Sequence, residues 1–292
     1  MKGKHRMAEH EQGMCQEAMG VEAAHRVGLL RSGLTWRTTT RLTLTLLPLM
    51  FLGCRGGEGG ATPDPAAEAV APVHNTLTAE EVAAGWQLLF DGVSTAGWRG
   101  YNQDAFPAAG WGVGDGNLIV MASDGSEEGL GGDIVSEEEF SNFELLFEFL
   151  VTPVGNSGVF YRVVENPELV MWQVAPEYQV LDDSAYIEMG TMDMNKHLTG
   201  DNYDLQASAV RASNPIGEWN QGRILVDGTH VEHWLNGQLT VAYDLFSPEW
   251  EAQVAGSKFA PHPEYARAMS GRIGIQDHGH ELRYRNIKIR PF

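Results

Sequence analysis

The stretch Phe143-Glu144-Leu145-Leu146-Phe147-Glu148-Phe149-Leu150-Val151 alternates in a way that indicates a β-strand. Its odd-numbered positions are all large and apolar, whereas Glu144 and Glu148 fall on the opposite face. Successive side chains of a strand point to opposite faces of a sheet, so one face of this strand packs on a core and the other meets water. The sequence therefore predicts antiparallel sheets around a hydrophobic interior.

Other segments have the same character, with turn signals between them. Asp227-Gly228 and Asn236-Gly237 predict a three-stranded meander, and Gly114-Asp115-Gly116 predicts a hairpin. His278-Gly279 is interpreted as the turn of a final hairpin. The strands expected are 86–91, 111–113, 117–121, 157–164, 176–181, 223–226, 230–235, 238–243, 271–276 and 282–289.

Two short helices are expected among the strands. Thr78 followed by Glu81 forms a capping box, and Ser247-Pro248-Glu249 has the N-cap, proline and acid of a helix start. Many strands with few helices predict one β-sandwich of about 210 residues, over residues 77–292.

Length and charge limit the classes of partner. The chain has 292 residues and a formal charge of −19. Residues 1–54 carry seven Lys and Arg against four Glu, so the remaining residues carry −22. A domain this acidic repels phosphate, which excludes nucleic acid as a natural partner. Neutral or cationic ligands remain.

The N-terminal part is typical of an export signal. Arg37 and Arg41 precede an apolar run over residues 42–52, which is too short for a spanning helix. Phe51-Leu52-Gly53-Cys54 resembles a bacterial lipobox, so residues 1–54 are interpreted as a lipoprotein signal with Cys54 lipidated. The alternative is a plain secretory signal. Residues 55–76 are rich in Gly, Ala and Pro and are expected to be a flexible tether. With only Cys15 and Cys54, the domain has no disulfide framework.

Several strings together resemble the 3-keto-disaccharide hydrolase family, also described as 3-keto-glucoside 1,2-lyase and 3-keto-2-hydroxy-glucal hydratase domains. The likeness covers residues 78–292. The strings are Gly85-Trp86-Gln87-Leu88-Leu89-Phe90-Asp91-Gly92, Gly155-Asn156-Ser157-Gly158-Val159-Phe160-Tyr161-Arg162, Pro176-Glu177-Tyr178-Gln179-Val180-Leu181-Asp182, His233-Trp234-Leu235-Asn236-Gly237 and Gln276-Asp277-His278-Gly279.

This resemblance implies a concanavalin-like jelly roll, similar to laminarinases and lectins. It also implies action on 3-keto-glycosides. A ketone at C3 acidifies the proton on C2; a base removes that proton, the group on C1 leaves, and water adds back. Such chemistry needs a base, a group that stabilises the enolate oxygen and an acid for the leaving group.

Strand alternation gives the first candidate residues. Glu177 and Gln179 share one face of residues 176–182, which favours a ligand-facing surface with Glu177 in catalysis and Gln179 binding substrate. The alternative is a solvated outer face. Arg162 is expected to lie with Phe160 and either to pair with Glu177 or to reach the ketone oxygen. Tyr161 is a further substrate-binding candidate.

The remaining candidates lie in loops. His197 is the predicted base, since an unperturbed histidine titrates near pH 6.5. His278 is a second acid–base candidate, Lys258 is a candidate for enolate stabilisation, and Gln276 is a candidate for substrate binding.

Evidence for cofactors is thin. Asp182, Asp183 and Glu188 form the best oxygen cluster, so a divalent cation is possible, but an acidic loop is the simpler interpretation. No dinucleotide or Walker fingerprint is present, because Gly129-Leu130-Gly131-Gly132 precedes no expected helix. Oxidation at C3 would therefore belong to a separate sugar 3-dehydrogenase. The only membrane contact expected is through a lipid anchor, which predicts a periplasmic or cell-envelope location.

Two other functions are compatible with a β-sandwich of this kind. A non-catalytic carbohydrate-binding lectin could use the same fold without tuned acid–base groups. A retaining glycanase needs two carboxyl groups about 5–5.5 Å apart. The face formed by Glu177, Gln179 and Leu181 offers only one acid, which argues against the glycanase.

Overall fold

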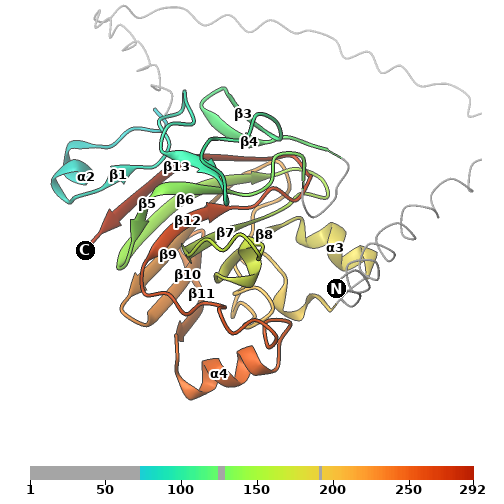
Figure 1. The fold of residues 1–292 in the computed structure, drawn as a ribbon. Coiled ribbons are helices and arrows are strands. Elements are labelled where there is room, and N and C mark those ends of the chain that lie inside the picture. Colours follow the sequence, from blue (N-terminus) through green and yellow to red (C-terminus); the bar gives the residue numbers. More distant parts are fainter. Residues whose placement is uncertain (1–72, 124–128, 191–192) are drawn as a thin grey trace, which may run out of the picture. The chain divides into compact units, whose positions relative to one another are not determined.

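The computed structural model describes residues 73–123, 129–190 and 193–292, and it shows two antiparallel sheets packed face to face (Figure 1). The predicted signal segment, the tether up to residue 72, and both cysteines lie outside the described residues. Asn75 already belongs to the sandwich. Its backbone N–H donates to Asn286 Oδ1 at 2.6 Å, and the Asn286 N–H donates to Asn75 Oδ1 at 2.8 Å.

The larger sheet has eight strands within the described residues. Its order is β11 (Gln238–Asp244), β10 (His230–Leu235), β9 (Trp219–Asp227), β6 (Phe143–Val151), β13 (Leu282–Pro291), β4 (Asn117–Val120) and β3 (Trp111–Gly114), with β1 (Gln87–Leu88) also paired to β13. The smaller sheet has the order β2 (Trp98–Gly100), β5 (Ile134–Phe140), β12 (Gly271–Ile275), β7 (Asn156–Val163) and β8 (Glu177–Leu181). The predicted all-β jelly-roll sandwich is confirmed.

Short helices lie before the first strand and in the connections between the strands. They are α2 (Ala79–Ala83), α3 (Asp183–Met189) and α4 (Pro248–Ala255), with 3₁₀ turns η1 (Met171–Gln173) and η2 (Met194–Lys196). Both predicted N-caps are confirmed: Thr78 forms its capping box with Glu81, and Ser247 accepts a hydrogen bond from the Trp250 N–H. Helix α3 was not predicted from the sequence; Asp182 caps its start.

The predicted final hairpin is wrong. Strand β12 lies in the smaller sheet and β13 in the larger one, so the connection around His278-Gly279 crosses between sheets. The Asp277 carboxylate explains this path, because it accepts hydrogen bonds from Leu130 N and Gly131 N at 3.1 and 2.8 Å. These bonds tie the connection to the segment before β5.

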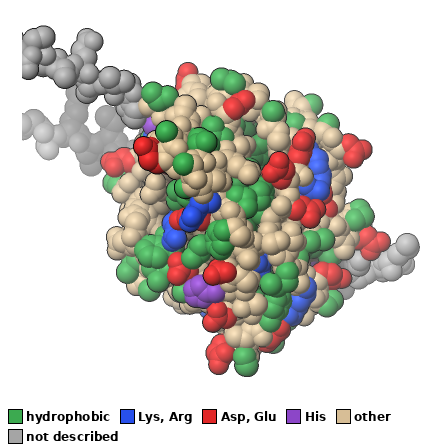
Figure 2. All heavy atoms as spheres, turned by 90° about the vertical axis from the view of Figure 1, so that its left-hand side faces the viewer, with side chains coloured by type: hydrophobic (Ala, Val, Ile, Leu, Met, Phe, Trp, Pro, Cys, Tyr) green, Lys and Arg blue, Asp and Glu red, His purple; other side chains and the backbone are tan. Residues whose placement is uncertain are grey.

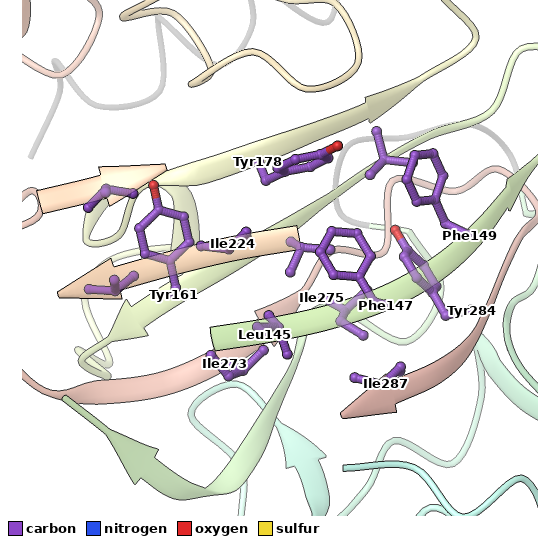
Figure 3. Close-up of a cluster of buried hydrophobic side chains, with 14 of the residues drawn as sticks. Leu145, Phe147, Phe149, Tyr161, Tyr178, Ile224, Ile273, Ile275, Tyr284 and Ile287 are labelled. Atoms are coloured by element: carbon purple, nitrogen blue, oxygen red, sulfur yellow. The ribbon is translucent and has the colours of Figure 1, made fainter. Parts of the chain in front are cut away.

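The core lies between the sheets. Figure 3 shows Tyr161 and Tyr178 of the smaller sheet pointing toward Phe147 and Ile224 of the larger one. The Phe147 and Tyr178 rings meet edge to face, with centroids 5.3 Å apart. A second apolar cluster, with Val135, Phe160, Val163, Met171, Val174 and Ala175, covers part of the outer face of the smaller sheet.

Glu144 and Glu148 lie on the outer face of the larger sheet, as the alternation predicts. Glu144 pairs with Arg223 at 2.5 Å and with Arg290 at 2.7 Å, and Glu148 pairs with Arg285 at 2.7 Å. Figure 2 shows one face of the molecule, on which acidic side chains are spread out and several have Lys or Arg beside them. Among the described residues, no helix is long and apolar enough to cross a membrane.

Candidate functional site

Strand β8 sends its polar side chains to the outer face of the smaller sheet. Tyr178 and Val180 belong to the core between the sheets. Glu177 and Gln179 alternate with them and therefore point away from that core, although each is only 3% exposed. Glu177 and Gln179 thus share a face as predicted, and at these two residues that face is buried rather than solvated.

A polar row crosses the outer face beside these residues. Gln179 on β8 is paired with Gly158 on β7, and the Gln276 N–H after β12 donates to the Gly158 carbonyl at 3.0 Å. Gly158 leaves space for the Glu177 carboxyl: a Cβ at that position would lie 2.0 Å from Glu177 Oε1. The carboxyl group therefore rests over Gly158, between the two strands that carry Gln179 and Gln276.

Burial makes Glu177 a weak acid. Loss of water raises its pKa to about 8, an effect that the negative charge of Asp133 reinforces and the positive charge of Lys258 opposes. No described residue donates a hydrogen bond to its carboxyl oxygens. Glu177 is consequently protonated near neutral pH, which makes it a proton donor rather than an ion-pair partner.

Lys258 supplies positive charge at this site. Its Nζ lies 3.3 Å from the Tyr203 hydroxyl, 4.1 Å from the Trp172 ring centroid and 4.4 Å from the Tyr203 ring centroid. Its backbone N–H donates to Asp204 Oδ2 at 2.8 Å. The two aromatic rings hold the ammonium group through cation–π contacts and a hydrogen bond, which positions it while leaving its charge in place.

His197 lies in the same cluster, but both of its ring nitrogens are engaged. Nε2 is 3.1 Å from Asp204 Oδ1 and Nδ1 is 2.5 Å from the Asp193 carbonyl oxygen. Its ring also meets the Tyr203 ring edge to face, with centroids 4.7 Å apart. In this arrangement His197 supports Tyr203 and Asp204, which in turn contact Lys258. Its predicted role as the base stays a prediction.

His278 contributes a neutral imidazole. Burial lowers its pKa to about 4, and the charges of His280 and Lys258 act in the same direction. Its Nδ1 is buried without a hydrogen-bond partner among the described residues. Gln179 is similar: Nε2 donates to Asn156 Oδ1 at 3.3 Å, but Oε1 is buried without a partner in the described part of the chain. Unpartnered buried polar atoms are rare in folded proteins, so these two atoms are available to hydrogen bond with a ligand.

Two predicted substrate-binding residues lie elsewhere. Tyr161 points between the sheets, where its hydroxyl hydrogen bonds to Tyr243 and to His233 Nε2, the latter at 2.9 Å. It is 0% exposed and does not reach the outer face.

The expected placement of Arg162 is wrong. Its guanidinium donates to the carbonyls of Ser141 and Gly228, each at 2.7 Å from Nη2. It does not pair with Glu177. The cause is local: Arg162 has a φ of 53°, and the pairing of β7 with β12 shifts register there. This bulge breaks the alternation that placed Arg162 beside Phe160.

In the predicted oxygen cluster of Asp182, Asp183 and Glu188, the two aspartates accept hydrogen bonds from neighbouring residues. Asp182 caps α3, and Asp183 accepts hydrogen bonds from the Thr199 N–H at 2.8 Å and the Thr199 hydroxyl at 2.9 Å. Among the described residues, no group of three or more His, Cys, Asp or Glu is placed to hold a metal. A separate hollow of about 290 Å³ borders this cluster, lined in part by Leu181, Asp183, Asn214 and Ile216.

Asp133 and Trp172 belong to the site but were not singled out for it from the sequence. Asp133 directly precedes β5, a strand that was not predicted because Glu137, Glu138 and Glu139 interrupt its apolar pattern. The adjacent apolar residues Ile134 and Val135 were the available signal in the sequence, and in the structure they face the two apolar clusters.

Comparison with known proteins identifies the family. The sequence profile described as 3-keto-alpha-glucoside-1,2-lyase-like domain matches residues 85–290. A 3-keto-disaccharide hydrolase of Bacteroides thetaiotaomicron is 31% identical over 274 residues, covering 82% of this chain and 94% of the relative.

Solved structures agree. One candidate glycosyl hydrolase from Parabacteroides distasonis ATCC 8503 is 32% identical with a TM-score of 0.68, covering 75% of this chain and 100% of that one. A second from the same organism is 27% identical with a TM-score of 0.53, covering 71% of this chain and 99% of that one. The sandwich and its relatives define the class as glycoside-acting enzymes at the family level. The chain belongs to the 3-keto-alpha-glucoside-1,2-lyase-like family, which confirms the resemblance found in the sequence.

Proposed function

We propose that this protein cleaves 3-keto-glycosides by removal of the C2 proton, elimination of the C1 group and addition of water. The observation that carries this proposal is the Glu177 carboxyl, which is buried on the outer face, protonated near neutral pH, and close enough to Lys258 for its pKa to respond to that charge. The family supports a 3-keto sugar as substrate.

Two roles follow from the charges. The Lys258 ammonium group stabilises the enolate oxygen at C3, since a fixed positive charge in a recessed site favours the charge that develops there. Protonated Glu177 gives its proton to the departing C1 oxygen. The Gln179 and Gln276 amides bind sugar hydroxyls, and neutral His278 serves as a hydrogen-bonding partner rather than as an acid.

The first experiment compares 3-keto-trehalose with trehalose, using the full chain with and without chelator. Release of 3-keto-glucose or a keto-glucal from the oxidised sugar alone is expected. Equal activity on both sugars would favour a glycanase, and binding without turnover of either would favour a carbohydrate-binding lectin.

Glu177→Gln tests the acid role more sharply. With a 3-keto-disaccharide the variant should lose about 10²–10⁴-fold in rate, since an alkoxide leaves poorly without a proton. With a 4-nitrophenyl 3-keto-glucoside it should stay close to wild type, because nitrophenolate leaves unaided. Equal losses on both substrates would reject Glu177 as the acid. Glu218→Gln, a change at an exposed glutamate, is the matched control.

We also propose export and lipidation at Cys54, on the basis of the apolar run and lipobox in the sequence. Expression of the full chain in a bacterium with radiolabelled palmitate should label the wild type and Cys15→Ser, but not Cys54→Ser. Labelling that survives Cys54→Ser would reject the anchor. The oxidised substrate would come from a separate sugar 3-dehydrogenase.

A further inference from the structure

The polar row on the outer face, which contains Glu177, Gln179 and Gln276, ends at the carboxyl group of Asp133. Ile275 pairs with Ile134, and Gly274 with Val135, so the next pair along the ladder is Gln276 with Asp133. Ile134 faces the core between the sheets and Val135 faces the outer cluster. Continued alternation places Asp133 on the outer face, next to Gln276.

Asp133 and Glu177 therefore flank one stretch of the sheet. The Glu177 carboxyl lies over Gly158 on β7, and Asp133 stands two strands away, with β12 between them. Two strand spacings amount to about 10 Å between backbones, a separation that a sugar ring can span. The charge of Asp133 also acts at Glu177, whose pKa it raises.

One hydrogen bond from a described residue holds the Asp133 carboxyl. Its Oδ1 accepts the Asp277 N–H at 3.0 Å, and no described residue donates to its Oδ2. Asp277 is itself fixed by the glycine-rich segment, where Leu130 N and Gly131 N donate to its carboxylate. A Cβ at Gly129 would lie 2.1 Å from the Asp277 carboxylate, so this close approach requires glycine there. The glycine-rich segment thus positions Asp133 through Asp277.

The electrostatic setting agrees with this geometry. Burial raises the pKa of Asp133 to about 7, with the Asp277 N–H opposing and the Asp277 charge reinforcing that rise. A carboxylate of this kind is a stronger base than a solvated aspartate. It is half-buried, so a ligand on the outer face can reach it.

We propose that Asp133, in place of His197, is the base that removes the C2 proton, with Glu177 as its acid partner across the polar row. This inference rests on the proposed function. The C2–H bond breaks, its proton goes to Asp133 Oδ2, and its electron pair forms the enolate with the C3 carbonyl. The C3 carbonyl then re-forms as a C1–C2 double bond develops, and the C1 oxygen departs with the Glu177 proton.

Hydration runs the same exchange in reverse and restores both groups. After elimination Asp133 is protonated and Glu177 is ionised. The oxygen of a water molecule then bonds to C1 while Glu177 takes a proton from that water. Asp133 returns its proton to C2. No oxidant or reductant is required, and one pair of carboxyl groups serves both steps.

The test uses Asp133→Asn, which keeps an oxygen to accept the Asp277 N–H. The variant should lose about 10²–10⁴-fold in turnover of both the 3-keto-disaccharide and the 4-nitrophenyl 3-keto-glucoside. It should also lose exchange of the C2 hydrogen with deuterated water, followed by NMR. Glu177→Gln should retain that exchange, since proton removal precedes the step it impairs. Asp115→Asn, at an exposed turn, is the control.

The outcomes separate this inference from the function on which it rests. If the wild type turns over 3-keto-trehalose while Asp133→Asn retains both turnover and C2 exchange, Asp133 is not the base and the proposed function stands. If the wild type neither turns over nor exchanges either oxidised sugar, the proposed function fails. A thermal melt of each variant identifies loss through unfolding, in which case Asp133→Glu must recover part of the exchange or the inference is rejected.

Discussion

The two faces of β8 differ in the kind of polar group that they bury. On the inner face, the Tyr178 hydroxyl donates to the Trp234 carbonyl at 3.1 Å, and nearby Tyr161 hydrogen bonds to His233 and Tyr243. On the outer face, no described residue donates a hydrogen bond to the Glu177 carboxyl. Gln179 Oε1 has no partner among the described residues, which is also true of His233 Nδ1 on the inner face. Both faces are buried, but only the outer one holds a carboxyl group.

This difference distinguishes buried polar groups that stabilise the fold from buried polar groups that serve catalysis. Buried hydroxyls that hydrogen bond to each other add to stability, because folding replaces their water contacts. A buried carboxyl without partners lowers stability, and proteins retain such groups chiefly where chemistry uses them. A change on the outer face should therefore affect activity, whereas a change on the inner face should affect the free energy of unfolding.

Gly158→Ala should have a severe effect on activity. A Cβ at Gly158 would lie 2.0 Å from Glu177 Oε1, so the carboxyl must move. A displacement near 1 Å in a catalytic group lowers rates by about 100-fold. Measurement of kcat/KM on a 3-keto-disaccharide checks this. Gly112→Ala is the control, because its Cβ would meet only the Met121 side chain, at 3.7 Å or more. Unchanged activity in Gly158→Ala would show that the position of the Glu177 carboxyl is unimportant.

Much of the fold was predictable because period-two alternation records which face is buried. Strand β6 has the predicted bounds, Phe143–Val151, and the hairpin turn at Asn236-Gly237 has both residues at positive φ, as its type requires. The error at β12 and β13 has a physical cause. His278-Gly279 marks a turn, but local sequence does not record whether the next strand pairs with the last one or crosses to the other sheet.

Site residues could be predicted from the sequence only where they lie on the same strand. Glu177 and Gln179 followed from alternation within β8. The expected placement of Arg162 is wrong because a bulge at that residue interrupts the alternation of side chains between the two faces of β7. Its φ of 53° cannot be recognised in the alternation of apolar and polar residues in the sequence. Asp133 was missed because it joins Glu177 only through the order β5, β12, β7 and β8, which is a property of the whole sheet.

Glu177→Gln should make the protein more stable at alkaline pH. An unfolded glutamate ionises near its ordinary pKa of 4.5, whereas folded Glu177 ionises near 8. Its contribution to stability is therefore fully present below the lower value and is lost as pH rises through the higher one. Each pKa unit corresponds to about 1.4 kcal/mol in the free energy of unfolding.

Glutamine is neutral throughout, so the difference in Tm between Glu177→Gln and wild type should increase from about pH 6 to about pH 9. Thermal melts across this range test the effect. Asp133 and Lys258, whose charges act on Glu177, are unchanged in the variant. A difference in Tm that does not change with pH would mean that folded Glu177 ionises like a solvated residue.

Tyr161→Phe should produce the opposite pattern on the inner face. Loss of the hydroxyl leaves His233 Nε2 and the Tyr243 hydroxyl without this partner, in a place that water does not reach. The expected loss is about 1–3 kcal/mol of unfolding free energy. The kcat/KM on a 3-keto-disaccharide should stay within about twofold of wild type, because the ring remains and β8 keeps its register. A large fall in kcat/KM in a folded Tyr161→Phe variant would mean that the inner network also tunes the outer face, and the division between the two faces of β8 would no longer hold.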